Sequence, residues 1–364
     1  MNKNPNPGEL PSRPNLEQLR KQAKDLKASD KHSTLSDAQL ALARQYGFLS
    51  WPKLKQAAEL RLLRHLIQDG EVEPVRQLLD ESPGLINLAF EEGETPLHCA
   101  AEENRPAIVE LLVQKGADFT LRYASSAHTP LSWALTCWST DAALKLVELG
   151  DKPDLFCAAG LGLMGHLRSF WQDGVLIENA SQTGSSRFDD NGIALPRPPE
   201  SPQDQVSDAL YIACRNGQLE ASRFLLEKGA DPDFRGYSGA TCLAWAHFSE
   251  NQELVDLLIA RGASNDVRDQ QFGVRTSEFA VMVMASWGFG YKLAEKLKAD
   301  PSLARLETAY GTPLHAAAEA GNEFIVKLLL AVGADPSVEN ARGQTAGDLA
   351  KAKGLENIVN LLYG

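Results

Sequence analysis

Apolar residues recur at helical spacing in short blocks along most of the chain, and the blocks come in pairs. The clearest pair lies in residues 93–122. Its first block has a narrow apolar face of Leu97, Ala100 and Ala101, and its second block is the aliphatic run 108–112. A spacing of three to four residues is typical of helices with one buried side. The pattern predicts two short helices per unit, which share one face and leave another to be covered by neighbouring units.

The ends of these two helices are marked by polar residues, proline and glycine. Thr95 precedes Pro96, which predicts a hydroxyl cap followed by a proline at the first helical position, where the missing N–H costs nothing. Gly116 follows the second block. Glycine adopts the left-handed conformation that often ends a helix, so we expect the second helix to stop there.

The same signals return along the chain. The run Thr312-Pro313-Leu314-His315 repeats the opening of the unit, and Gly-Ala or Gly-Ala-Asp closes later units at Gly229, Gly262 and Gly333. Leu97 and Leu131 are 34 positions apart, and Gly229 and Gly262 are 33 apart. A period of 33 residues opened by Thr-Pro-Leu-His is the signature of ankyrin repeats.

The chain therefore resembles the ankyrin-repeat family. The resemblance implies an all-α solenoid of about nine ankyrin repeats, some of them degenerate, that acts by binding another macromolecule. We expect a disordered lead at 1–13, an N-terminal helical cap segment at 14–60 and the ankyrin-repeat array at 61–364. The segment 14–60 resembles the short helical segment before the repeats of some bacterial ankyrin proteins. An alternative for it is a separate basic docking surface, since residues 1–60 hold ten Lys and Arg against six Asp and Glu.

The period is irregular in the third, fourth and seventh repeats. Leu131 and Leu155 are only 24 positions apart, which predicts that the third repeat has lost most of its hairpin. We expect the fourth repeat's second helix to include Trp171. Residues 178–208 exceed the length of one repeat period and are rich in Ser, Gly and Pro. This composition predicts an inserted loop. It is either a tolerated insertion or a flap over the binding groove, with Phe188, Ile193 and Leu195 as its anchors.

Composition limits the classes of partner and the cellular compartment that we expect. The net charge of −12 argues against a nucleic-acid partner. The most apolar stretch, 279–291, is shorter than the roughly 20 residues that span a bilayer, so no membrane partner is expected. The five cysteines stand singly, without a C-x-x-C pair, and fit a reducing cytoplasm. We expect a cytoplasmic, bacterial monomer.

The residues that suggest catalysis have structural explanations. His98 and His315 occupy the fourth motif position, where the family uses the imidazole to tie neighbouring repeats together. The G-x-G-x-x-G run at 160–165 follows Phe156-Cys157-Ala158-Ala159 inside a repeat, whereas a dinucleotide site needs a preceding strand. We expect no enzyme activity, no cofactor and no metal.

The remaining candidate functional residues lie on the expected surface of the stack. In ankyrin stacks the partner usually lies on the concave side, made by hairpin tips and first helices. Two sets of residues fall there: an acidic set that favours a basic protein partner, and a mixed set of types enriched at interfaces. The acidic set is Glu91, Glu92, Glu94, Glu102 and Glu103, and the mixed set is Arg235, Tyr237, Ser238 and Phe248. Trp133 and Trp245 are expected in the core.

The sequence thus predicts a non-catalytic scaffold that binds a protein on the concave face of the stack. Two alternatives stay open. One is a bacterial immunity or inhibitor protein with a single target. The other is an enzyme with a site in the irregular repeats three to five.

Overall fold

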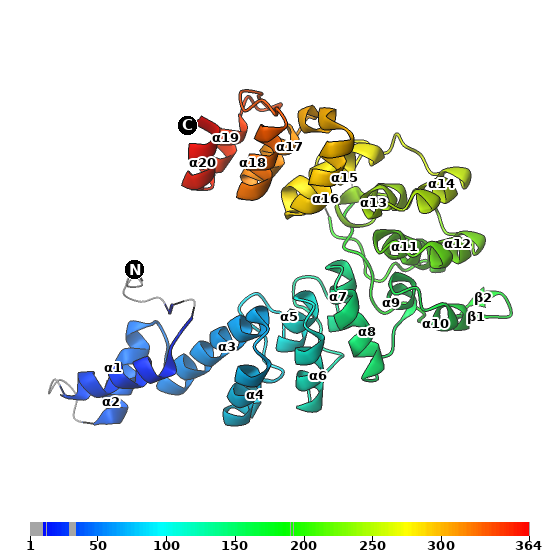
Figure 1. Ribbon diagram of the computed structural model, residues 1–364. Helices are drawn as coiled ribbons and strands as arrows, with labels where there is room; N and C mark the ends of the chain where they lie inside the picture. The colour runs from blue at the N-terminus through cyan, green and yellow to red at the C-terminus, as the bar shows by residue number, and fades with distance from the viewer. Residues whose placement is uncertain (1–9, 12, 29–33, 190, 192, 364) are drawn as a thin grey trace. The chain divides into compact units, whose positions relative to one another are not determined.

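The computed structural model describes residues 10, 11, 13–28, 34–189, 191 and 193–363, without the side chains of Ser238 and Ser277. These residues form two compact units divided after Pro153, each built from paired short helices (Figure 1). Most of the predicted disordered lead lies outside the described residues. Leu10 and Arg13 belong to the first unit: Leu10 is buried, and Arg13 forms an ion pair with Asp69.

The first unit begins with two helices, α1 and α2, and continues with three helix pairs. Its elements are α1 (Leu16–Ala28), α2 (Leu35–Gln45), α3 (Trp51–Asp69), α4 (Val72–Glu81), the 3₁₀ turn η1 (Pro83–Leu85), α5 (Pro96–Glu102), α6 (Pro106–Gln114), α7 (Pro130–Thr136) and α8 (Thr140–Glu148).

The predicted boundary at residue 60 falls inside the long helix α3, so the cap segment and the first repeat share one helix. Its first half packs with α1 and α2 through Leu54 and Ala58, and Leu63 and Ile67 in its second half are also buried. Pro52 stands at the start of the helix, and no later residue interrupts it before Gly70, which ends it with φ +79°.

The second unit contains six helix pairs. Its elements are α9 (Leu155–Gly160), α10 (Met164–Ser169), β1 (Trp171–Gln172), β2 (Val175–Leu176), α11 (Pro202–Arg215), α12 (Leu219–Glu227), η2 (Tyr237–Gly239), α13 (Cys242–Ser249), α14 (Gln252–Ala260), α15 (Thr276–Trp287), α16 (Gly290–Ala299), η3 (Pro301–Arg305), α17 (Pro313–Glu319), α18 (Glu323–Ala331), α19 (Ala346–Ala352) and α20 (Glu356–Tyr363).

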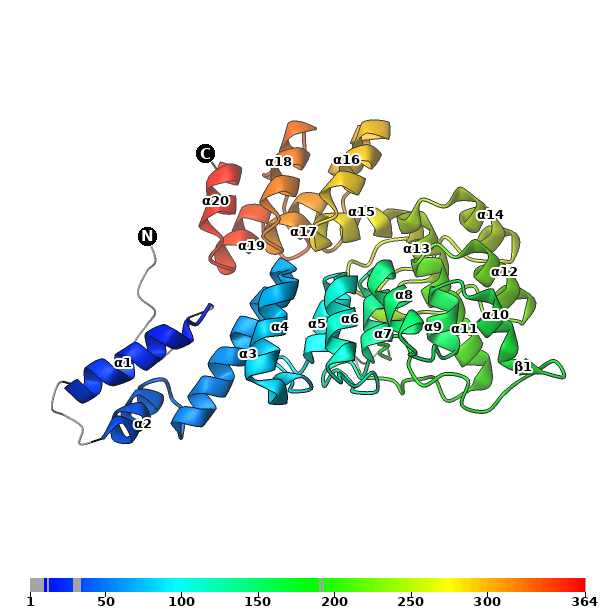
Figure 2. The ribbon, with the colours of Figure 1, turned by 60° about the horizontal axis from the view of Figure 1, so that its bottom comes forward.

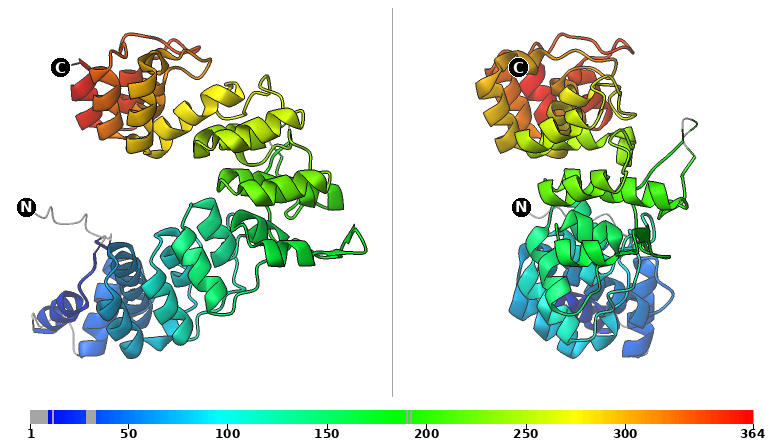
Figure 3. Two further views of the ribbon diagram at one scale, coloured as in Figure 1. Left: turned by 45° about the vertical axis from the view of Figure 1, so that its right-hand side comes forward. Right: turned by 90° about the vertical axis from the view of Figure 1, so that its right-hand side faces the viewer.

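Within each unit, the first helix of a pair packs on the first helix of the next pair. In the first unit α5 lies between α3 and α7, and α6 lies between α4 and α8 (Figure 2). In the second unit the odd-numbered helices from α9 to α19 follow one another in the same way, as the successive helix rows in Figure 3 show. The apolar faces predicted to need neighbours are therefore covered by neighbouring repeats.

The predicted helix ends are confirmed. Thr95 caps α5 through its side chain, with Pro96 at the first helical position. Gly116 and Gly229 have φ of +93° and +87°, the left-handed region that favours glycine.

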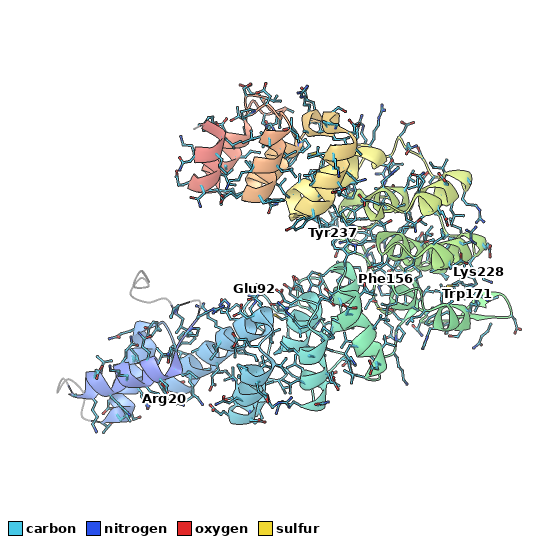
Figure 4. All side chains as sticks on the ribbon, in the orientation of Figure 1. Arg20, Glu92, Phe156, Trp171, Lys228 and Tyr237 are labelled. Atoms are coloured by element: carbon cyan, nitrogen blue, oxygen red, sulfur yellow. The ribbon has the colours of Figure 1, made fainter. Side chains whose placement is uncertain are left out.

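The irregular repeats differ from the expectation in one place. Only residues 149–154 join α8 to α9, so the third repeat has lost most of its hairpin, as predicted. Trp171, however, does not continue the second helix of the fourth repeat. α10 ends at Ser169, and Trp171 instead pairs with Leu176 in a two-stranded hairpin. Its ring packs against Phe224 of α12 at 5.1 Å between centroids, with Lys228 over it (Figure 4).

The insertion predicted at 178–208 ends earlier than expected, because Ser201 caps α11 and the residues from Pro202 onward are helical. The start of the loop is fixed by two aspartates. Asp154 accepts hydrogen bonds from the Gln182 and Thr183 backbone, both at 2.8 Å. Asp208, inside α11, accepts from the Ser185 backbone at 3.0 Å and from its hydroxyl.

The outer part of this loop turns back on itself through a bridge between Phe188 and Ala194. Phe188 and Ile193 are exposed and Leu195 is half-buried, so the side chains named as anchors contribute little to the core. Whether the loop acts as a flap stays a prediction.

Candidate partner-binding surfaces

The predicted acidic set is assembled by a tight turn in front of α5. The Phe90 N–H donates to the Glu94 carbonyl at 2.8 Å, and the Gly93 N–H donates to the Phe90 carbonyl. Gly93 has φ +92°, and a Cβ there would lie 2.7 Å from the Ala124 side chain, so only glycine fits. The turn places Glu91 and Glu92 at the exposed tip of the loop, beside α3. Glu92 is labelled in Figure 4.

Two arginines of α3 reach this loop. Arg61 pairs with Glu91 at 2.7 Å, and Arg64 pairs with Glu92 at 2.6 Å. The acidic set is therefore partly neutralised, a pairing that the pattern of residues did not predict. We call the five glutamates together with Arg61 and Arg64 the Glu–Arg surface.

Glu94 was expected at the surface but is only 2% exposed, because the turn directs its side chain inward to Arg64, 2.9 Å away. Burial raises the pKa of the Glu94 carboxyl to about 7; Arg64 opposes that rise, and the neighbouring Glu102 adds to it. Glu102 is exposed and accepts a hydrogen bond from the Trp133 indole at 3.1 Å, and Glu103 is half-buried.

A groove of about 580 Å³ lies between α3 and the loop. Ala57, Leu60 and Phe90 supply apolar lining, and the Arg64 guanidinium lies 5.9 Å from the centre of the Phe90 ring. The polar lining is Arg61, Arg64, His65, Gln68, Glu91 and Glu92. A groove with apolar walls and charged edges is suited to holding a peptide segment.

The residues that α3 contributes were missed, although the repeat period points to them. Leu63 lies 34 positions before Leu97, so Arg64 occupies the position of His98 in the next repeat. Both side chains reach the loop of the following repeat. The His98 Nε2–H donates to the His128 carbonyl at 3.0 Å, and Arg64 contacts Glu92 and Glu94.

The motif histidines are structural, as predicted. Because the Nε2 of His98 donates, its Nδ1 accepts from the Thr95 hydroxyl at 2.8 Å. Burial lowers the pKa of His98 to about 4, outweighing the bond to the His128 carbonyl, which raises it. His315 repeats the arrangement, with its Nε2 3.0 Å from the Gln344 carbonyl. These imidazoles join consecutive repeats.

We expect His98→Ala to lower the free energy of unfolding of the first unit by about 2–3 kcal/mol, because the Thr95 N–H would be left unpaired in the interior and the bond from the imidazole to the His128 carbonyl would be lost. The His128 carbonyl would keep only the hydrogen bond from the Tyr123 N–H, at 2.8 Å. Urea denaturation followed by circular dichroism measures this. The exposed His166→Ala is the control, with an expected change below about 0.5 kcal/mol. Equal midpoints for both variants would show that His98 does not couple the repeats.

The mixed set is only partly at the surface. Arg235 and Tyr237 are exposed, whereas the side chain of Ser238 lies outside those described. Phe248 was expected to be exposed but is 2% exposed. Its ring is 5.5 Å from that of Trp245 and 5.1 Å from that of Phe289, because α13 turns this side toward the next repeat.

The G-x-G-x-x-G run lies at the turn between α9 and α10, as expected, with Gly162 at φ +66°. Among the described residues, no group of three or more His, Cys, Asp or Glu side chains could hold a metal ion. In the same part of the chain, no helix is both long and apolar enough to cross a membrane.

A sequence model of ankyrin repeats in three copies matches residues 54–156, 195–269 and 281–364, more than half of the chain. This chain belongs to the ankyrin-repeat family. The predicted all-α ankyrin-repeat solenoid is confirmed, with nine helix pairs in the residues that the structure covers. Ankyrin repeats are binding modules, and this supports a role in protein interaction.

Known ankyrin proteins match parts of the chain. The human B-cell lymphoma 3 protein is 24% identical over 299 residues, which are 80% of this chain and 54% of that protein. The human NF-kappa-B inhibitor epsilon is 31% identical over 160 residues, 41% of this chain and 31% of that protein. The palmitoyltransferase Hip14 of Drosophila melanogaster is 27% identical over 233 residues, 64% of this chain and 34% of that enzyme. The ankyrin chain thus spans about half the length of the first relative and about a third of the other two.

Proposed function

We propose that this ankyrin chain is a non-catalytic scaffold that binds a basic segment of another protein on the Glu–Arg surface. The observation that carries the proposal is the groove of about 580 Å³ between α3 and the loop before α5. It is the place where apolar side chains, two arginines and a cluster of carboxylates come together within one unit.

The charge balance of the surface favours a basic partner. Glu94 is buried, so four glutamates at the surface stand against two arginines, and Glu102 and Glu103 have no arginine partner in the described part of the chain. The pairs at the loop tip are exposed, with the Glu91 side chain 68% and the Glu92 side chain 52% accessible. Exposed pairs contribute at most about 1 kcal/mol each, so a partner's Lys or Arg can replace one arginine at small cost.

The apolar lining gives the partner something to bury. Leu60 and Phe90 line the groove, and Trp133 stands beside Glu102 on the next first helix. A basic segment with one apolar side chain would place its cations on the glutamates and that side chain between α3 and Phe90. Such an interface combines an apolar centre with a polar rim.

The test begins with a pull-down from native extract to identify the partner. The decisive variant is then Glu102→Lys with Glu103→Lys. We expect it to slow association by about tenfold or more, since charge complementarity acts mainly on the association rate, and to leave stability within about 0.5 kcal/mol of the wild type. Association of the wild-type protein should also weaken as salt rises.

The matched control is Glu227→Lys with Glu253→Lys, which makes the same change in net charge on exposed positions of α12 and α14. Its association rate should stay close to that of the wild type. Binding that ignores salt and both double variants would mean that the partner lies elsewhere and that the Glu–Arg surface is solvated only.

A single-target inhibitor is the second candidate, favoured by the similarity to a protein named as an NF-kappa-B inhibitor. A tight one-to-one complex that blocks the activity of its target would distinguish it from a general scaffold. An enzyme in the irregular repeats has less support. The aspartates there, Asp154 and Asp208, are both occupied by hydrogen bonds from the inserted loop.

We propose further that the protein acts as a monomer in the cytoplasm, as the isolated cysteines suggest, and that neither nucleic acid nor membrane is its partner. The bacterial source suggested by the segment 14–60 stays a prediction. Size-exclusion chromatography with light scattering would test the monomer.

A further inference from the structure

In the middle of the first unit, Lys and Arg side chains form contacts within the protein. Every Lys and Arg from residue 55 to residue 145 forms an ion pair or donates to a backbone carbonyl. The eight residues are Lys55, Arg61, Arg64, Arg76, Arg105, Lys115, Arg122 and Lys145. Cations between residues 55 and 145 are therefore held by a carboxylate or a carbonyl. Elsewhere in the unit, Arg44, Lys53 and Lys152 have no such partner among the described residues.

Among the described residues of this unit, helix α1 carries the largest group of cations without such a partner. It carries Arg20, Lys21, Lys24 and Lys27, all exposed, and none of them has an ion-pair or hydrogen-bond partner among the described residues. Arg20 is labelled on this helix in Figure 4. We call Arg20, Lys24 and Lys27 the basic stripe, because the spacing i, i+4, i+7 places them along one side of the helix.

The helix that carries the stripe packs against the rest of the first unit. The side of α1 next to the stripe, with Leu19 and Ala23, is buried in an apolar cluster with residues of α2 and α3. Arg20 to Lys27 spans seven residues of helix, which is about 10 Å. The stripe is thus a short row of three cations that follows the exposed Glu17 of the first turn, and no rearrangement of α1 is needed to present it.

We propose that the basic stripe of α1 docks a short acidic segment of a partner protein. Charge complementarity identifies the chemistry, since three cations in a row, without internal partners, lie on a protein whose net charge is −12. Carboxylates on an extended or helical segment could reach all three across about 10 Å. This site is separate from the Glu–Arg surface and would recognise a partner of opposite charge.

Two other anionic partners fit less well. A membrane-binding amphipathic helix inserts its apolar face, but the apolar face of α1 is already buried in the protein. A nucleic acid extends beyond 10 Å, and residues 61–364, with a net charge of −16, would repel it. A short acidic protein segment avoids both costs.

The experiment measures binding of a fluorescently labelled octaglutamate peptide to the full chain by anisotropy, at about 50 mM and about 150 mM salt. The decisive variant is Arg20→Glu, Lys24→Glu, Lys27→Glu. The matched control is Arg261→Glu, Lys298→Glu, Lys351→Glu, which makes the same charge change at exposed positions of the second unit. Glutamine at the three stripe positions, checked by circular dichroism, provides a milder second variant.

We expect the stripe variant to weaken peptide binding by about tenfold or more, the glutamine variant to weaken it less, and the control to change it by less than about threefold. The same titrations use an oligodeoxynucleotide of equal charge and vesicles of phosphatidylcholine with phosphatidylserine. The proposal fails if the peptide does not bind or if the control loses as much affinity as the stripe variant. It also fails if DNA or vesicles bind more tightly through the stripe, or if sedimentation shows that the stripe mediates self-association.

Discussion

Replacing Trp245 by alanine is expected to lower the free energy of unfolding of the second unit by about 3–5 kcal/mol. Trp245 is fully buried in α13 and lies at the centre of an aromatic cluster. Its ring is 5.0 Å from that of Phe279 and 5.9 Å from that of Trp287, so it links two consecutive first helices. Its removal would leave a cavity that neither helix can fill without moving.

The cluster also holds a charge. The Arg215 guanidinium lies 4.0 Å from the centre of the Trp245 ring, and Arg215 is only 4% exposed. A cation over an indole face is stabilised by the ring quadrupole, and that contribution grows when water is excluded. Trp245→Ala therefore removes packing and also weakens the environment of a buried cation.

Urea denaturation of the full chain, followed by circular dichroism, measures the effect. The control is Trp133→Ala in the first unit, where the indole is half-buried and a smaller loss is expected. Trp245→Phe, which keeps an aromatic ring, should recover part of the stability. If Trp245→Ala unfolds at the same urea concentration as the wild type, the second unit is not organised around this ring.

The stability of the second unit is expected to fall by about 3 kcal/mol as the pH rises from about 4 to about 6, because of Asp208 alone. Asp208 is 1% exposed in α11, and burial raises the pKa of its carboxyl from 3.8 to about 6. The hydrogen bonds from Ser185 and the charge of Arg187 only partly offset that rise.

The sign follows from proton binding. Between pH 4 and pH 6 the folded chain keeps the proton on Asp208 that the unfolded chain has already lost. The folded state then binds more protons than the unfolded state, so stability decreases with rising pH and levels off above pH 6. Asp208→Asn cannot ionise, and this contribution should be absent from its profile.

Chemical denaturation at a series of pH values tests this. The difference in unfolding free energy between wild type and Asp208→Asn should change by about 3 kcal/mol in favour of the variant from pH 4 to pH 7. The exposed Asp173→Asn should follow the wild type throughout. A constant difference between wild type and Asp208→Asn would mean that Asp208 stays ionised in both states and that its burial has no net cost.

This carboxyl also explains why the inserted loop is not simply an addition to the stack. A Cβ on Gly184 would lie 2.6 Å from the Asp208 carboxylate, so the loop backbone passes close against α11. Removal of the loop from residue 184 onward would take Ser185 away from a buried carboxyl. Only the outer part, around Phe188 and Ile193, is free of such contacts with the core.

The sequence by itself determined the features that depend on neighbours along the chain. Thr95 and Pro96 start α5, and Gly116 and Gly229 adopt the left-handed conformation after the second helices, because caps and helix ends involve residues within one turn of each other. The 33-residue period identified the repeats, and the register of His98 and His315 identified their structural role.

Only the tertiary structure decided which side chains meet across repeats. In the folded chain, Arg64 contacts Glu92 and Glu94. Glu94 and Phe248 are buried, and Trp171 lies in a hairpin and not in the predicted helix. These outcomes depend on the direction of a loop or the neighbour of a helix face, which the local spacing of residues does not encode. The exposure of a charged or aromatic side chain depends on whether the next repeat packs against it. Burial requires contact between two elements, whereas the spacing of residues in the sequence describes the face of only one.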